Sequence, residues 1–301
     1  DNIDVNVVTA GTGQFLVNGA AVGGSNALLD GSAHTDTAAG TVVRGDLVVG
    51  NSTPKWARLA IGPVGARLTS DGQDVYWATA LNTHYYLEDF IVQNVANVAT
   101  FVPHGWGVSA AGIGAAVSLI DGEQDAPGLV QCSTGTDTTG RASIVSGNSQ
   151  SHVFGGGRFK WGWRINIATL SDGTDTYTVR LGFGDSSTGD FTDGVYFEYS
   201  STILAGEWQG AAINNGVKST LDSNTLAATG WTRLEADVNA AGTSCEYFVN
   251  GTSVGTVASN IPTAAGRVSS PRFQLIKSAG ITARTVKLDY FWYYQKMTAD
   301  R

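Results

Sequence analysis

The sequence predicts an all-β protein in which an extended segment and β-hairpins precede an antiparallel β-sandwich. Three observations carry this prediction. Apolar residues recur at every second position in many short segments, glycine is frequent (39 of 301 residues) while proline is scarce (6), and no long segment has helical periodicity. Glycine, asparagine and aspartate between the apolar runs supply the backbone angles of tight turns. A helix is expected at most over residues 92–100.

Composition divides the chain into three segments. Residues 1–40 are rich in small and polar residues with little to fill a core, so we expect an extended Gly/Ala-rich attachment arm. Residues 41–84 contain short apolar runs between turn sequences, which is typical of a small β-meander. Such a segment buries little surface by itself, so we expect it to be an assembly module completed by neighbouring chains.

The third segment, residues 85–297, has the clearest strand pattern. From Phe159 to Ile167 every second residue is large and apolar, and five further strands repeat this alternation. Period two indicates a strand with one buried face, so the segment predicts an antiparallel β-sandwich or jelly roll. Asn250-Gly251 predicts a tight hairpin turn. The further residues expected to face the core are Tyr177, Val179, Leu181, Phe183, Val195, Phe197, Tyr199, Leu234, Ala236, Val238, Cys245, Tyr247, Val249, Val286, Leu288, Tyr290, Trp292 and Tyr294.

Charge and composition exclude several classes of partner. The net charge is −8, with no cluster of Lys and Arg, which argues against a nucleic-acid partner. No apolar run approaches the roughly 20 residues of a membrane span, so no membrane insertion is expected. Cys132 and Cys245 are expected to be buried free thiols, with a single disulfide as the alternative.

The titratable residues give no complete catalytic or metal site. Glu235 and Asp237 are two residues apart on one strand face, as glycosidase carboxylates can be, but no further acid follows them. The four histidines lack metal-ligand spacing. We therefore expect no catalytic residue, no metal and no cofactor. The acidic residues of one loop region are expected to be solvated turn residues, with a calcium site as the alternative. They are Asp172, Asp175, Asp185, Asp190 and Asp193.

Tryptophan is the remaining candidate for ligand binding, because sugar rings stack on exposed aromatic faces. Most tryptophans lie on alternating strands and are expected in the core. Trp208, in a glycine-rich segment, and Trp231 are the expected exceptions, with Arg233 on the same strand face as Trp231. These three residues are the predicted ligand-binding site.

Two segments contain familiar sequence patterns. The first pattern is carried by residues 29–37, 45–50, 54–62 and 68–72. On these residues, segment 29–80 resembles a module of tailed-bacteriophage fibre and virion proteins, which occurs in elongated, usually trimeric appendages. The second pattern is carried by residues 86–90, 230–238, 248–255 and 288–294. On these, segment 85–295 resembles the concanavalin-like (laminin-G-like) β-sandwich, in which the concave sheet often contacts carbohydrate.

Together these features predict a non-enzymatic structural protein of a phage virion, a tail-fibre or appendage subunit. The resemblance implies a homotrimer on the virion surface, contacts with other virion proteins, and attachment to a host-surface glycan. One alternative is a capsid decoration protein or head fibre. A secreted carbohydrate-binding module and a polysaccharide depolymerase are the others.

Overall fold

The computed structural model describes residues 15–17, 20–22, 37–38, 41–53, 55–70, 72–78, 83–91, 105–146 and 152–298. The chain divides into two compact units, Asp1–Ala80 and Leu81–Arg301. The described residues form antiparallel strands and one short 3₁₀ turn (Leu204–Gly206), which confirms the all-β prediction. The helix considered for residues 92–100 lies outside the described residues.

The first unit consists of three strand pairs in the part of it that is described. They are β1 (Phe15–Val17) with β2 (Ala20–Val22), β3 (Leu47–Gly50) with β4 (Trp56–Leu59), and β5 (Arg67–Ser70) with β6 (Val75–Ala78).

Polar contacts hold the hairpins of the first unit. The Asp46 carboxylate accepts hydrogen bonds from Arg58 Nε (2.5 Å) and the backbone N–H of Ile61 (3.0 Å). The hydrogen bond from Arg58 lowers the pKa of Asp46. The Trp77 indole donates to the backbone carbonyl of Ala60 (2.8 Å), which ties the second hairpin to the end of the first. Among the residues of this unit whose burial is described, Thr37 and Ala78 are the buried ones, as expected for so short a segment.

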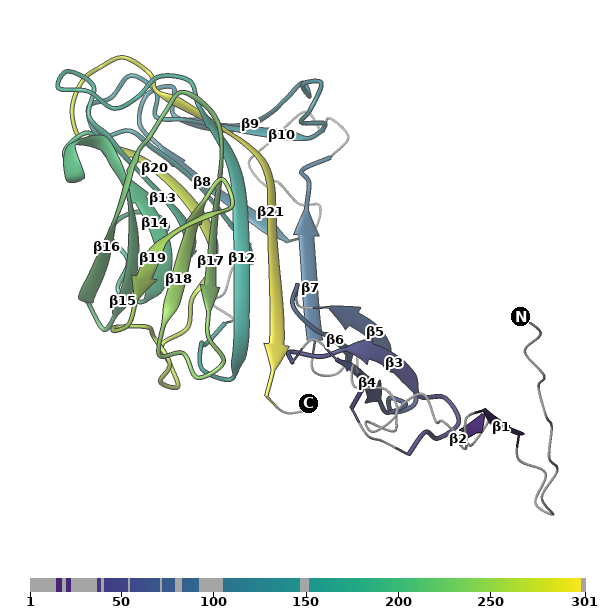
Figure 1. Cartoon of the computed structure of the whole chain (residues 1–301). Coiled ribbons are helices and arrows are strands. Elements are labelled where there is room, and N and C mark those ends of the chain that lie inside the picture. Colours follow the sequence, from purple (N-terminus) through teal and green to yellow (C-terminus); the bar gives the residue numbers. More distant parts are fainter. Residues whose placement is uncertain are drawn as a thin grey trace. The chain divides into compact units, whose positions relative to one another are not determined.

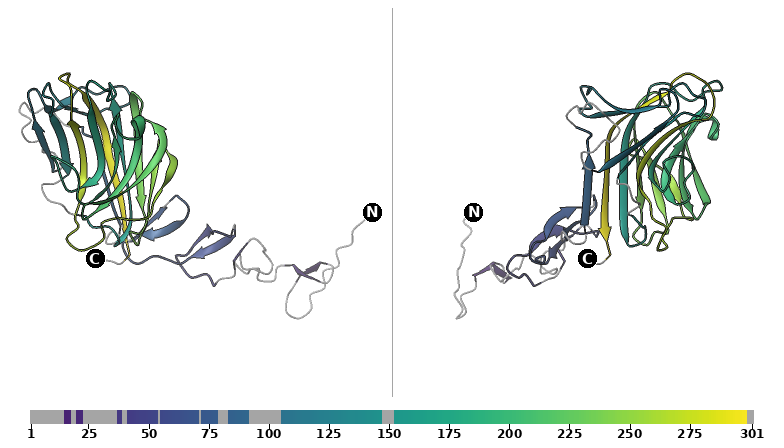
Figure 2. Two further views of the ribbon diagram at one scale, coloured as in Figure 1. Left: turned by 90° about the vertical axis from the view of Figure 1, so that its left-hand side faces the viewer. Right: turned by 180° about the vertical axis from the view of Figure 1, so that it is seen from behind.

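The second unit is a sandwich of two antiparallel sheets (Figures 1 and 2). The first sheet has the order β19 (Thr252–Val257), β18 (Cys245–Val249), β17 (Gly230–Val238), β12 (Gly157–Ile167), β21 (Thr285–Met297), β10 (Leu129–Ser133) and β9 (Ala116–Ile120). Strand β7 (Thr83–Glu88) also pairs with β21, beside its C-terminal half. The second sheet has the order β16 (Val217–Leu226), β15 (Glu207–Asn214), β14 (Gly194–Tyr199), β13 (Tyr177–Gly184), β20 (Ser270–Lys277), β11 (Arg141–Ser146) and β8 (Trp106–Ala111).

An aromatic core fills the space between the sheets. Strand β12 contributes alternate side chains from Phe159 to Ile167, each at most 1% exposed, which confirms the prediction for this strand. Phe159 meets Phe183 of the facing sheet edge to face, with ring centroids 4.8 Å apart. The predicted turn is also confirmed, because Asn250 and Gly251 join β18 to β19 with positive φ angles of 51° and 82°.

The predicted alternation fails in the middle of β21. Arg164 is the partner of Tyr290 and Ile165 is the partner of Leu288, so Asp289 is an extra residue, a β-bulge. An extra residue transfers the following side chains to the opposite face. Phe291 and Tyr293 are therefore in the core. The prediction was wrong for Tyr290, Trp292 and Tyr294, which lie on the outer, half-exposed face.

Candidate ligand-binding site

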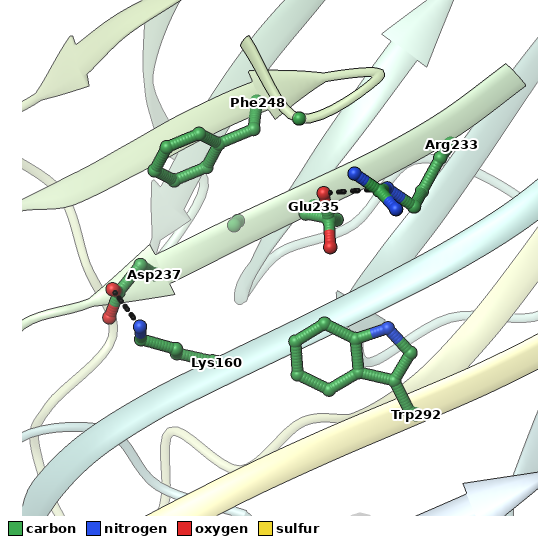
Figure 3. Close-up of a pocket in the computed structure, with 8 residues that line it drawn as sticks. Lys160, Arg233, Glu235, Asp237, Phe248 and Trp292 are labelled. Carbon is green, nitrogen blue, oxygen red and sulfur yellow. Dashed lines mark ion pairs between the residues drawn. The ribbon is translucent and has the colours of Figure 1, made fainter. Parts of the chain in front are cut away.

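The outer face of the first sheet contains an open hollow of about 270 Å³. Figure 3 shows side chains from four neighbouring strands around it. The lining residues are Lys160, Arg233, Glu235, Ala236, Asp237, Phe248, Gly251 and Trp292. All belong to the second unit, and the hollow lies on regular strands, which hold side chains more rigidly than loops do.

Strand register builds the hollow. Its centre is a row of Cα partners across four strands, here called the central row: Phe248 on β18, Glu235 on β17, Gly162 on β12 and Trp292 on β21. A Cβ atom at Gly162 would lie 2.5 Å from the indole nitrogen of Trp292 and 3.1 Å from Cγ of Glu235. Because Gly162 has no side chain, the Trp292 ring can lie over this position at the base of the hollow.

Ion pairs fix the polar wall of the hollow. Arg233 Nε lies 2.9 Å from Glu235 Oε2. Arg158 donates two hydrogen bonds to Asp237, of 3.0 and 2.7 Å, and Lys160 Nζ lies 3.3 Å from the same carboxylate. Bidentate pairs of this kind hold a carboxylate in one orientation.

A second glycine makes room for Arg233. A Cβ atom at Gly251 would lie 2.6 Å from a guanidinium nitrogen of Arg233. Because Gly251 has a positive φ in the hairpin turn, the turn chemistry and the position of Arg233 depend on the same residue. Of the predicted ligand-binding residues, Arg233 is the one that lines the hollow.

Trp231 lies next to the hollow in a separate cluster. The Arg164 guanidinium lies over its ring, 4.6 Å from the centroid. The Trp231 indole donates to Glu123 (3.3 Å), which is also paired with Lys287. The hydrogen bond from Lys287 is the main reason that the pKa of Glu123 is lowered. Ligand binding by Trp231 stays a prediction.

The prediction for Trp208 was wrong. This side chain is 1% exposed and packs in the core against Tyr199, with ring centroids 5.4 Å apart. Strand β15 begins at Glu207, so alternation turns Trp208 inward. The glycine-rich segment before it forms the 3₁₀ turn and does not extend to an exposed tryptophan.

Sequence reasoning missed Phe248, Lys160 and Trp292. Phe248 and Lys160 carried a usable signal, since each is out of phase with its buried neighbours on an alternating strand. Trp292 carried the wrong signal, because only the bulge at Asp289 turns it outward.

The acidic loop residues do not converge. Asp172 and Asp175 share Arg284 (2.8 and 3.1 Å), Asp190 pairs with Arg180 (2.6 Å), and Asp193 pairs with Arg267 (3.3 Å). Hydrogen bonds from backbone N–H groups are the main cause of the lowered pKa of both Asp172 and Asp175. Within the described ranges, no group of three or more His, Cys, Asp or Glu residues could hold a metal ion.

The cysteines are both buried free thiols, as predicted, and the disulfide alternative was wrong. Burial raises the pKa of Cys132 and of Cys245, so both thiols are kept neutral. In the described part of the chain, no helix is long and apolar enough to cross a membrane.

Comparisons with known proteins identify a family and a fold. The family described as SO2946-like, C-terminal domain, matches residues 125–289. The crystal structure of SO2946, a protein of unknown function from Shewanella oneidensis MR-1, is 14% identical with a TM-score of 0.53, and the match covers 74% of this chain and 90% of that one. No curated protein matches. At this identity the likeness shows a shared fold and transfers no site.

Two further solved structures match with TM-scores below 0.5. The carbohydrate recognition domain of Emp47p is 12% identical, with a TM-score of 0.49 and coverage of 73% of this chain and 100% of that one. A carbohydrate esterase, vb_24B_21 from Shiga toxin-encoding bacteriophage phi24B, is 10% identical, with a TM-score of 0.42 and coverage of 64% and 90%.

Proposed function

We propose that this chain, which belongs to the family of SO2946-like C-terminal domains, is a non-enzymatic protein whose sandwich binds a glycan at the hollow beside Trp292. One observation carries this proposal: an open aromatic ring beside carboxylates already oriented by cations. A sugar has apolar C–H faces that stack on an aromatic ring and hydroxyls that hydrogen-bond to carboxylates. Small-molecule sites generally combine apolar walls with a few placed polar groups in this way.

The ion pairs favour binding over hydrolysis. A glycosidase presents two carboxyl groups to the scissile bond, one of which donates a proton to the leaving group. Here both carboxylates are already engaged by cations: Arg233 lies against Glu235, and Arg158 and Lys160 lie against Asp237. The arrangement supports a role for both carboxylates as hydrogen-bond acceptors.

The first test is glycan binding by the full chain, with a glycan array followed by calorimetry on the best ligand. We expect Trp292→Ala to weaken binding about tenfold, since the loss of a stacking contact of about 1.4 kcal/mol has this effect. Trp292→Phe should recover part of the affinity, and Ile281→Ala, at a loop position 71% exposed, is the control. Unchanged affinity in Trp292→Ala would contradict the proposed site.

For the whole chain the proposal is a virion-surface subunit, in a tail fibre, appendage or capsid decoration, that displays this sandwich. The exposed apolar residues of the first unit support an assembly role, since they leave surface for sister chains to cover. They include Val42, Val43, Ile61 and Val64. Several weak sites on one trimeric appendage would raise avidity well above a single contact.

The assembly role is tested by the solution mass of the full chain. Light scattering should give three times the 31.3 kDa of one chain. The mass of a single chain across the concentrations used would contradict an assembly module in residues 41–84.

A further inference from the structure

We propose that the ligand of the hollow is an internal segment of an extended, uncharged polysaccharide that crosses the strands from Phe248 to β7. This inference rests on the proposed glycan-binding function and names its ligand class. On the surface beyond the hollow, the central row continues past Trp292 onto β7. Leu87 on β7 is the Cα partner of Trp292, so both side chains lie on the same face, and Leu87 is 55% exposed.

A second row runs beside the central row. It consists of Asp237 on β17, Lys160 on β12, Tyr294 on β21 and Tyr85 on β7, which are Cα partners in succession. Tyr85 is 61% exposed. The rows are two residues apart along each strand, about 7 Å. Together they form a band that is polar at β17 and apolar at β7.

The length of this band exceeds one sugar. Phe248 and Leu87 are separated by four strand spacings, from β18 to β7, and each spacing is about 4.8 Å, which gives roughly 19 Å. A single pyranose ring occupies about one such spacing. A terminal monosaccharide would therefore leave most of the band uncovered, whereas several consecutive sugars would contact both Phe248 and Leu87.

The charges around the band favour an uncharged chain. Three cations, Arg158, Lys160 and Arg233, face the carboxylates of Glu235 and Asp237, to which they are already paired. Glu246, the Cα partner of Asp237 on β18, adds a third carboxylate and accepts a hydrogen bond from the Ser253 hydroxyl (2.6 Å). The local charges cancel, so an acidic polymer would have to displace existing ion pairs to bind.

The test is the dependence of affinity on chain length, measured by calorimetry on the full chain. The probes are linear oligosaccharides of one to six units, neutral ones from the cellulose, chitin, laminarin and mannan series and acidic ones from the polygalacturonate series. We expect affinity in the recognised series to rise with each added unit up to about four, the number that spans roughly 19 Å, and then to level off. Tyr85→Ala should weaken the longest ligand several-fold and leave the disaccharide unchanged, while Trp292→Ala weakens both.

The outcomes separate this inference from the proposed function. Binding that does not depend on length, or that requires an acidic sugar, overturns the inference and leaves glycan binding at Trp292 intact. If the wild-type chain binds no glycan at all, both this inference and the proposed function are overturned. Leu226→Ala, at an exposed edge position of the second sheet, is the matched control and should bind every ligand as the wild type does.

Discussion

The two outer faces of the sandwich differ in what covers them. The outer face of the first sheet carries the open hollow and its aromatic side chains. The middle of the second sheet is covered by the chain itself, through a segment here called the strap, residues 185–192. Gln274 donates to the backbone carbonyls of Ser186 (2.5 Å) and Gly189 (3.1 Å), and the Ser143 hydroxyl donates to that of Ser187 (3.1 Å).

The second sheet also has polar side chains on its outer face. Seven residues in register form a polar row across the whole second sheet: Ser109, Ser143, Gln274, Arg180, Glu198, Gln209 and Asp222. Gln274 and Glu198 in this row are 0% and 2% exposed. Burial also lowers the pKa of the adjacent Arg272 to about 10. A polar row on a sheet therefore does not identify a ligand site, because the strap covers the middle of this one at Ser143 and Gln274.

The strap is fixed by packing as well as by hydrogen bonds. The Phe191 ring lies over Gly184, where a Cβ atom would be 2.6 Å from the ring, and meets Tyr196 edge to face at 4.8 Å. In the first sheet a glycine also makes room for an aromatic ring, but that ring does not close off the outer face. Gly162 also admits an aromatic ring, but the ring of Trp292 is half-exposed and leaves the hollow open.

The sharpest test of this difference compares Glu198→Ala with Glu235→Ala. Glu198 is buried and paired with Arg180 (2.6 Å) and Lys218, and Arg180 also binds Asp190 of the strap. Its removal leaves partly buried cations with too few partners, so we expect the free energy of unfolding to fall by about 3 kcal/mol. Glu235 pairs with the half-exposed Arg233, and its removal should cost less than about 1 kcal/mol.

Urea denaturation of both variants measures the difference, and glycan binding provides the second readout. Glu198→Ala should bind as the wild type does at temperatures where it is folded, and Glu235→Ala should bind more weakly. Equal losses of stability in the two variants would mean that the strap does not distinguish the faces.

The sequence correctly predicted the features of the fold that depend on regular alternation of apolar and polar residues. It located the buried faces of β12, β13 and β17 and the turn at Asn250-Gly251, because period two and turn chemistry are local properties. It did not predict the strap, since the aspartates of that region are equally suited to a solvated loop. It assigned Trp208 to the surface because the first residue of a strand, which sets the phase, cannot be read from a glycine-rich segment.

The bulge at Asp289 explains the largest error in the sequence prediction of the site, which was the placement of Trp292 in the core. One extra residue inverts the second half of β21, and no local pattern distinguishes this from a regular strand whose aromatic residues fill both faces. The Asp289 carboxylate accepts a hydrogen bond from Arg164 (2.5 Å), and its other oxygen has no hydrogen-bond partner among the described residues. A feature of tertiary packing therefore determines that Trp292 faces the hollow and Phe291 the core.

The smallest predicted effect concerns the charge at this bulge. Burial raises the pKa of Asp289 above its ordinary value of 3.8, so the folded chain holds the proton more tightly than the unfolded chain does. The stabilising contribution is full below pH 3.8 and is lost as the pH rises through the raised value. Asp289→Asn does not titrate, so its melting temperature relative to the wild type should increase from pH 3 to pH 7.

Thermal unfolding of both proteins across this pH range measures the trend, with Asp121→Asn, at an exposed loop position, as the control. A relative melting temperature that falls with pH would show that the pair with Arg164 outweighs burial. Because asparagine has the same shape as aspartate, the bulge should persist, and glycan affinity at Trp292 should stay within about twofold of the wild type, a free-energy change of roughly 0.4 kcal/mol. Retained binding would show that the outward position of Trp292 depends on the extra residue and not on its charge.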